Sequence, residues 1–130
     1  MSEPVWINRR ALEHLHGLSI VQHGGADGLR DEGLFESALA RPQNLFAYEV
    51  GVTDPSRLAA SYAFGLAKNH AFVDGNKRVA FIALGLFLRL NGWRLTADQA
   101  QATMIILSVA SSAFSEDELA GWVRRNVAPL

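Results

Sequence analysis

The stretch HAFVDGNKR, residues 70–78, joins two segments whose apolar side chains recur at helical spacing. Before it, Asp54-Pro55 places a capping carboxylate ahead of a helical stripe that runs to about His70. After Gly75, a strongly apolar stripe continues to Asn91-Gly92, where a helix stop is expected. The nine residues are therefore expected to connect two helices, with their polar side chains gathered at the start of the second one.

On the N-terminal side, the pattern predicts two helices followed by a flap. Asn8 is placed to cap the first helix, which ends at Gly24-Gly25. Asp31 is placed to cap the second, a short helix that ends before Pro42. Apolar residues then alternate as in a short hairpin or flap, although a loop folded onto the core would fit equally well: Phe46, Tyr48, Val50 and Val52.

On the C-terminal side, two capping-box patterns predict two more helices. One begins at Thr96 with Gln99 and runs to about residue 113, and the other begins at Ser115 with Glu118. The helix after Gly75 is the most apolar, so we expect it to lie at the centre. The sequence thus predicts an all-α fold, a single compact bundle of about six helices with a short flap or hairpin, and one domain over residues 1–130.

The composition limits the kinds of binding partner and the cellular compartment that we expect for this protein. Twelve Lys plus Arg against thirteen Asp plus Glu give a formal net charge of -1, so direct nucleic-acid binding is not expected. The chain has no cysteine, which excludes disulfides and thiolate zinc sites. No stretch approaches the roughly 18 uninterrupted apolar residues of a spanning helix, so we expect no membrane anchor and a cytoplasmic protein.

The residues of the 70–78 stretch suit chemistry on a phosphate group. The first turn of a helix offers unpaired backbone N–H groups to phosphate oxygens, and Gly75 lets the backbone approach closely. Lys77 and Arg78 add two cations, and Asp74 offers the oxygen ligand that Mg2+ takes beside phosphates. His70 can act as the base, because imidazole titrates near neutral pH and can accept the proton of an attacking hydroxyl.

Each of these residues also has a structural interpretation. A lone His70 is more often a helix-terminal or core histidine than a catalyst, and Asn76 could be a plain helix cap. Asp31 and Glu32 suit a cap and a first-turn acid better than an acid-base pair. The other histidines are expected to be non-catalytic and to bind no metal: His14, His16 and His23.

The same nine residues resemble the signature of the Fic/Doc family, which reads His-x-Phe-x-Asp/Asn-Gly/Ala-Asn followed by Gly or Lys and then Arg. Residues 28–34, 40–42 and 88–92 also resemble the death-on-curing toxins of that family. The resemblance implies that His70 is the base, that Asp74 binds the metal ion and that Phe72 anchors the loop. It further implies a flap at Phe46 and Tyr48 that docks the target by strand addition. The implied ATP-binding and phosphate-binding residues are Gly75, Asn76, Lys77 and Arg78.

The resemblance leaves two chemistries open. The adenylyl-transferring branch resembles His-Pro-Phe-x-x-Gly-Asn-Gly-Arg-x-x-Arg, whereas this chain has Lys77 at the second glycine and Phe81 at the last arginine. Both departures resemble the Doc branch, whose members are similar to kinases that put the gamma phosphate of ATP on elongation factor Tu. The expected function is therefore a translation-arresting toxin that uses ATP and Mg2+. The alternatives are an adenylyl (AMP) transferase and a non-catalytic helical binding module.

Resemblance to these toxins also implies a protein that controls the activity. The expected partner is a Phd-like antitoxin whose disordered tail folds on binding, with elongation factor Tu as the expected target. Some relatives carry an inhibitory Ser/Thr-x-x-x-Glu-Gly/Asn motif within the chain. The nearest match here, Ser112 to Glu116, is followed by Asp117, so control by a separate chain is expected.

Overall fold

The computed structural model describes residues 3–49 and 54–130, and most of its regular structure is helical. The helices of this described part are α1 (Arg9–His23), α2 (Glu32–Tyr48), α3 (Pro55–Asn69), α4 (Asn76–Leu90), α5 (Gln99–Ala110) and α6 (Glu116–Arg125). Two short strands accompany them: β1 (Trp93–Leu95) and β2 (Val127–Pro129). The expected all-α bundle of about six helices is confirmed.

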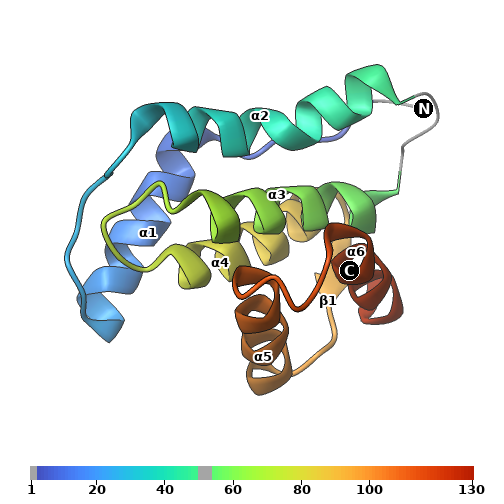
Figure 1. Cartoon of the computed structure of the whole chain (residues 1–130). Helices are drawn as coiled ribbons and strands as arrows, with labels where there is room; N and C mark the ends of the chain where they lie inside the picture. Colours follow the sequence, from blue (N-terminus) through green and yellow to red (C-terminus); the bar gives the residue numbers. More distant parts are fainter. Residues whose placement is uncertain (1–2, 50–53) are drawn as a thin grey trace.

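Helix α3 lies at the centre of the bundle, between α2 and α4, and it also contacts α5 and α6 (Figure 1). Most of its residues are buried, and many are small, so neighbouring helices approach it closely. A Cβ atom on Gly65 would lie 3.4 Å from Cα of Ala38 in α2. The expectation that the helix after Gly75 is central is therefore wrong, because α3 has neighbours on more of its sides.

Helix α2 is longer than the sequence predicts, because Pro42 lies inside it instead of beyond its end. A proline in a helix removes one backbone hydrogen bond. Pro42 is buried together with the residues that face α3, and this packing offsets the loss. The helix continues to Tyr48, after which the backbone N–H of Glu49 donates to the oxygen of Leu45 at 3.0 Å.

Phe46 and Tyr48 consequently lie in a helix, and the flap expected at these two positions is wrong. The Phe46 ring meets the Trp6 ring edge-on, with centroids 5.7 Å apart and planes at 73°. Tyr48 is 84% exposed. The other two residues of the alternation, Val50 and Val52, lie outside the described residues. The alternating pattern was therefore misleading, since the apolar side chains of a last helical turn can produce the same spacing.

Side-chain hydrogen bonds confirm most of the expected helix starts. Ser115 and Glu118 form the reciprocal capping box predicted for α6. Three further helices begin after a side-chain oxygen that accepts a hydrogen bond from a first-turn N–H: Asn8, Asp31 and Asp54. These helix starts could be predicted from the sequence because a cap involves only residues within one turn of each other.

The start of α5 differs from the expectation. Asp98 is its cap, with Oδ1 accepting from the N–H of Gln101 at 2.8 Å. The N–H of Thr96 instead donates to the oxygen of Asn126 at 2.6 Å, next to the antiparallel pair of β1 and β2. The capping box predicted at Thr96 and Gln99 is wrong, because this hydrogen bond to a distant segment holds Thr96 outside the helix.

The loop between α3 and α4 is attached to the hydrophobic core. Phe72, in the middle of this loop, is 3% exposed and belongs to the same cluster of buried side chains as Phe35 and Tyr62. The functional stretch therefore rests directly on the core. Across residues 3–49 and 54–130, none of the helices combines the length and apolar character needed to cross a bilayer.

Candidate active site

The loop over residues 70–75 has left-handed backbone at both of its ends. His70, which follows α3, has φ 51° and ψ 49°, and Gly75, which precedes α4, has φ 76° and ψ 21°. Gly75 adopts this conformation freely, whereas at a histidine it costs about 1–2 kcal/mol. Such a conformation persists only where surrounding contacts enforce it, and it occurs frequently at functional sites.

A segment from the other side of the loop, residues 28–31, supplies these contacts. The Arg30 side chain donates through Nε to the backbone oxygen of His70 at 2.7 Å and through Nη2 to that of Asn69 at 3.4 Å. The backbone N–H groups of Arg30 and Asp31 both donate to the oxygen of Ala71, at 2.7 and 3.0 Å. Residues 28–31 thus hold the backbone of His70 in place while leaving its side chain exposed.

Phe72 and Asn76 fix the middle of the loop. Phe72 packs edge-on against Phe35, with ring centroids 5.0 Å apart. The Asn76 side chain accepts from the N–H of Phe72 and donates to its oxygen, each at 3.0 Å. Asn76 does not cap α4 through its side chain, because that cap position is Gly75. Its side chain closes the loop, so what Asn76 can offer to a phosphate is its backbone N–H.

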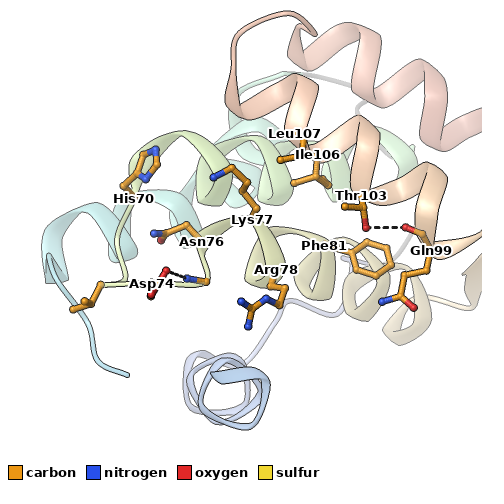
Figure 2. Close-up of a pocket in the computed structure, with 12 residues that line it drawn as sticks. His70, Asp74, Asn76, Lys77, Arg78, Phe81, Gln99, Thr103, Ile106 and Leu107 are labelled. Atoms are coloured by element: carbon orange, nitrogen blue, oxygen red, sulfur yellow. Dashed lines mark hydrogen bonds between the residues drawn. The ribbon is translucent and has the colours of Figure 1, made fainter. Parts of the chain in front are cut away.

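Asp74 lies at the turn into α4 with its carboxylate shared between two backbone groups. Oδ1 accepts from the N–H of Gly75 at 3.2 Å and Oδ2 accepts from the N–H of Ala26 at 3.3 Å. Figure 2 shows this carboxylate beside the start of α4. Among the described residues, no group of three or more acidic, histidine or cysteine side chains is arranged to hold a metal ion. A single carboxylate suits Mg2+ that is held mainly by phosphate oxygens and water.

The two cations of the stretch lie in different environments. Lys77 is exposed, and Figure 2 shows its ammonium end directed toward the side of the pocket where His70 lies. Arg78 is half-buried, and its Nη1 donates to the backbone oxygen and hydroxyl of Ser19, at 3.2 and 3.3 Å. All the hydrogen bonds of Arg78 to other described residues use Nη1, so Nε and Nη2 can still donate to an anion.

Together these residues form one wall of a pocket of about 420 Å³. It holds most of the residues that the sequence predicts for the site: His70, Asp74, Gly75, Asn76, Lys77 and Arg78. The charged side chains that line it are one acid and two bases, beside the positive end of α4, so the pocket suits an anion. Phe72 lies behind the wall in the core, and Phe46 and Tyr48 do not line the pocket.

The opposite wall comes from α5, none of whose residues was predicted to belong to the site. Its lining residues are Gln99, Thr103, Ile106 and Leu107, and Phe81 of α4 extends the apolar part of this wall. Figure 2 shows His70 at one end of the pocket and Phe81 with Gln99 at the other. One signal was present in the sequence: a single buried stripe cannot cover all the apolar residues of α5, and Leu107 stays 43% exposed.

The pocket therefore has a polar end with a base and cations, and a mainly apolar, uncharged end between two helices, where Thr103 and Gln99 add two polar groups. The volume is within the range of about 300–1,000 Å³ that is usual for small-molecule sites. An extended ligand with an anionic end and a flat apolar end would match this distribution. The geometry can support proton removal by His70 beside a phosphate group bound at the start of α4.

Comparison with known proteins gives consistent similarities. The sequence model of the Fic/DOC family matches residues 6–88, a range that contains the loop and α4 up to Leu88 but not α5. The protein called Protein kinase doc, of Escherichia phage P1, is 34% identical over 119 residues, which are 92% of this chain and 93% of that protein. The protein called Toxin Doc, of Mycolicibacterium smegmatis, is 47% identical over 81 residues, which are 60% of each chain.

Proposed function

This chain belongs to the Fic/DOC family, and we propose that it is a Doc toxin that transfers the gamma phosphate of ATP to a hydroxyl group of a protein. The toxin–antitoxin part of this function follows from the similarity to the two Doc proteins. The phosphoryl transfer, and elongation factor Tu as the protein that receives the phosphate, are what the proposal adds. Phosphorylation of this target would arrest translation.

The observation that carries the proposal is the division of the pocket into a polar and an apolar end. Phe81 and Ile106 provide apolar surface for the base of a nucleotide, and Phe81 lies at the end away from His70. A triphosphate that extends from there along the start of α4 would bring its terminal phosphate closest to His70. The gamma phosphate is then the one that an acceptor hydroxyl can attack while His70 removes its proton.

The bonds that change are those of phosphoryl transfer. The acceptor oxygen forms a bond to the gamma phosphorus, the bond from that phosphorus to the bridging oxygen breaks, and ADP leaves. His70 takes the hydroxyl proton, and Lys77, Arg78 and the first N–H groups of α4 stabilise the negative charge on the phosphate oxygens. Asp74 would hold Mg2+, which neutralises charge on the phosphates when bound.

The alternative is adenylyl transfer by the same pocket. That reaction requires the alpha phosphate beside His70, with the triphosphate tail extending away from it. Phe81 occupies the position where the adenylyl-transferring pattern has an arginine, and its ring contributes to the apolar end of the pocket. An anionic tail there would meet an aromatic ring in place of a cation. The geometry therefore favours the gamma phosphate.

A labelling experiment tests the proposal. The purified chain is incubated with Mg2+, a bacterial extract and ATP labelled at either the alpha or the gamma phosphate. We expect gamma label, and no alpha label, on a protein band. His70→Ala should reduce this transfer by a factor of about 10² or more. Alpha label on the band would instead support the adenylyl transferase, and no label of either kind would leave the non-catalytic binding module.

The toxin function also implies a control protein. We propose that this partner is a Phd-like antitoxin whose disordered tail folds on the toxin and blocks it. Such coupled folding and binding gives a large negative heat-capacity change, which calorimetry with the protein encoded by the neighbouring reading frame would detect. If no short neighbouring reading frame encodes a protein that binds, this part of the proposal is contradicted.

A further inference from the structure

His16 lies on the face of α1 that packs behind the candidate active-site loop. It is 2% exposed, and its Nε2 lies 2.7 Å from the backbone oxygen of Asp74. A carbonyl oxygen can only accept a hydrogen bond, so Nε2 carries the hydrogen and donates it. His16 therefore binds the backbone of the residue whose carboxylate is proposed to hold the metal ion.

The imidazole ring of His16 also packs against Phe72, two residues before Asp74, and beside Gly75, which follows it. It stacks on the ring of Phe72, with centroids 3.9 Å apart and planes at 22°. A Cβ atom on Gly75 would lie 3.3 Å from His16 Nε2 and 3.1 Å from Ile20 Cδ1. The ring thus fills the space between α1 and the loop, and Gly75 leaves just enough room for it.

We propose that His16 is a positioning residue for the transfer reaction, acting through the Asp74 carbonyl and not on the substrate. Its hydrogen bond fixes the plane of the peptide group between Asp74 and Gly75. The orientation of this peptide plane sets the position of the Asp74 side chain. It also sets the direction of the Gly75 N–H group and of the first turn of α4. The catalytic part of this inference rests on the proposed transfer reaction, whereas the effect on loop geometry does not.

A purely packing role would make a different prediction from a positioning role. If His16 only fills space, a ring of similar shape should replace it well. If its N–H group positions the loop, the replacement must donate a hydrogen bond at the same place. Without a donor at position 16, the Asp74 carbonyl oxygen loses its hydrogen bond. The peptide group would then rotate until this oxygen accepts a hydrogen bond from another donor.

Two variants separate these roles. His16→Phe keeps an aromatic ring on Phe72 but removes the donor. His16→Gln removes the ring but places an amide N–H at about the position of Nε2. His14→Phe is the matched control, because His14 is exposed on the same helix.

We expect His16→Phe to lower kcat by about tenfold or more, since small displacements of catalytic groups cost rates of this order. It should also raise the half-saturating Mg2+ concentration, while the KM for purified elongation factor Tu, the proposed target, should stay unchanged. His16→Gln should recover kcat to within a few fold of wild type even if its melting temperature is the lower of the two. The inference would be overturned if His16→Phe had the kcat of wild type. It would also be overturned if the kcat of His16→Gln were no higher than that of His16→Phe.

A second readout does not depend on activity. Amide hydrogen exchange of residues 72–76 should become faster in His16→Phe than in His16→Gln, with His14→Phe equal to wild type. Equal exchange rates of these amides in the two His16 variants would overturn the proposal that the His16 N–H positions the loop. Should wild type label no protein, the proposed function fails, and the exchange comparison still decides whether His16 positions this loop.

Discussion

Asp74 makes three hydrogen bonds, and two of them, to His16 and Ala26, link the loop to the rest of the molecule. Its backbone oxygen accepts from His16, and its carboxylate accepts from the N–H groups of Gly75 and Ala26. The carboxylate is thereby oriented before any metal ion binds. A preoriented carboxylate at the start of α4 is consistent with a site for Mg2+ beside phosphates.

Asp74→Asn tests the metal-binding role at the residue scale. The amide oxygen can still accept one of the two backbone hydrogen bonds, but the negative charge is lost. We expect the half-saturating Mg2+ concentration to rise by about tenfold or more, because Mg2+ in such sites usually has only one or two protein carboxylates. Asp117→Asn, at an exposed carboxylate of α6 that does not line the pocket, is the control. A Mg2+ titration identical to wild type would show that Asp74 is a turn residue only.

Lys77→Gly tests which phosphate is presented to the acceptor. Removing the ammonium group should lower gamma transfer, and it should allow some alpha transfer because position 77 then matches the adenylyl-transferring pattern. The gain in alpha transfer should stay small, since position 81 has a phenylalanine where the adenylyl-transferring pattern has an arginine for the triphosphate tail. Lys77→Ala is the control for loss of charge without added backbone freedom. If the ratio of alpha to gamma label is unchanged while ATP binding is retained, position 77 does not choose the chemistry.

Residue types in the loop could be predicted from the sequence, but several of their contacts could not. The residues expected in the site do line one pocket, apart from the anchor Phe72 and the flap residues Phe46 and Tyr48. The hydrogen bonds of Asn76 to Phe72 and of Arg78 to Ser19 depend on the folded loop and on α1. His16 was expected to be non-catalytic, because residues two apart on a helix, such as His14 and His16, point to different faces.

At the scale of elements, the site is made by α4 and α5 facing each other across the pocket. Capping residues within one turn predicted most helix starts correctly, whereas two boundaries were set by distant contacts. Packing on α3 carries α2 past Pro42, and pairing with Asn126 keeps Thr96 out of α5. Because α5 approaches α4 only in the folded chain, the sequence alone could not assign it to the pocket.

The α5 wall leads to a prediction about nucleotide binding. Thr103 faces the apolar end of the pocket, so Thr103→Trp should fill the space proposed for the base. We expect the KM for ATP to rise by about tenfold or more, the equivalent of about 1.4 kcal/mol of lost binding. Gln101→Trp places the same side chain at an exposed position of α5 that does not line the pocket. A KM for ATP that is equal in the two variants would contradict the placement of the base.

At the scale of the whole molecule, three separate parts of the chain and the hydrophobic core support one short loop. Residues 28–31 hold the backbone of His70, α1 packs behind Asp74 through His16, and α4 begins directly after the last loop residue. Phe72 ties the middle of the loop to the core. This arrangement leaves the His70 side chain exposed at the end of a pocket whose far wall is α5, where a protein substrate can reach it.

If this loop transfers the gamma phosphate of ATP to a protein hydroxyl, the intact mass of the target protein should change by the mass of the transferred group. Purified elongation factor Tu is incubated with the chain, ATP and Mg2+, and its mass is compared with that from a reaction with His70→Ala. We expect a gain of one phosphoryl group, with ADP formed in equal amount, and no gain with the variant. A gain of one AMP group, or a mass that does not change with wild type, would contradict this expectation.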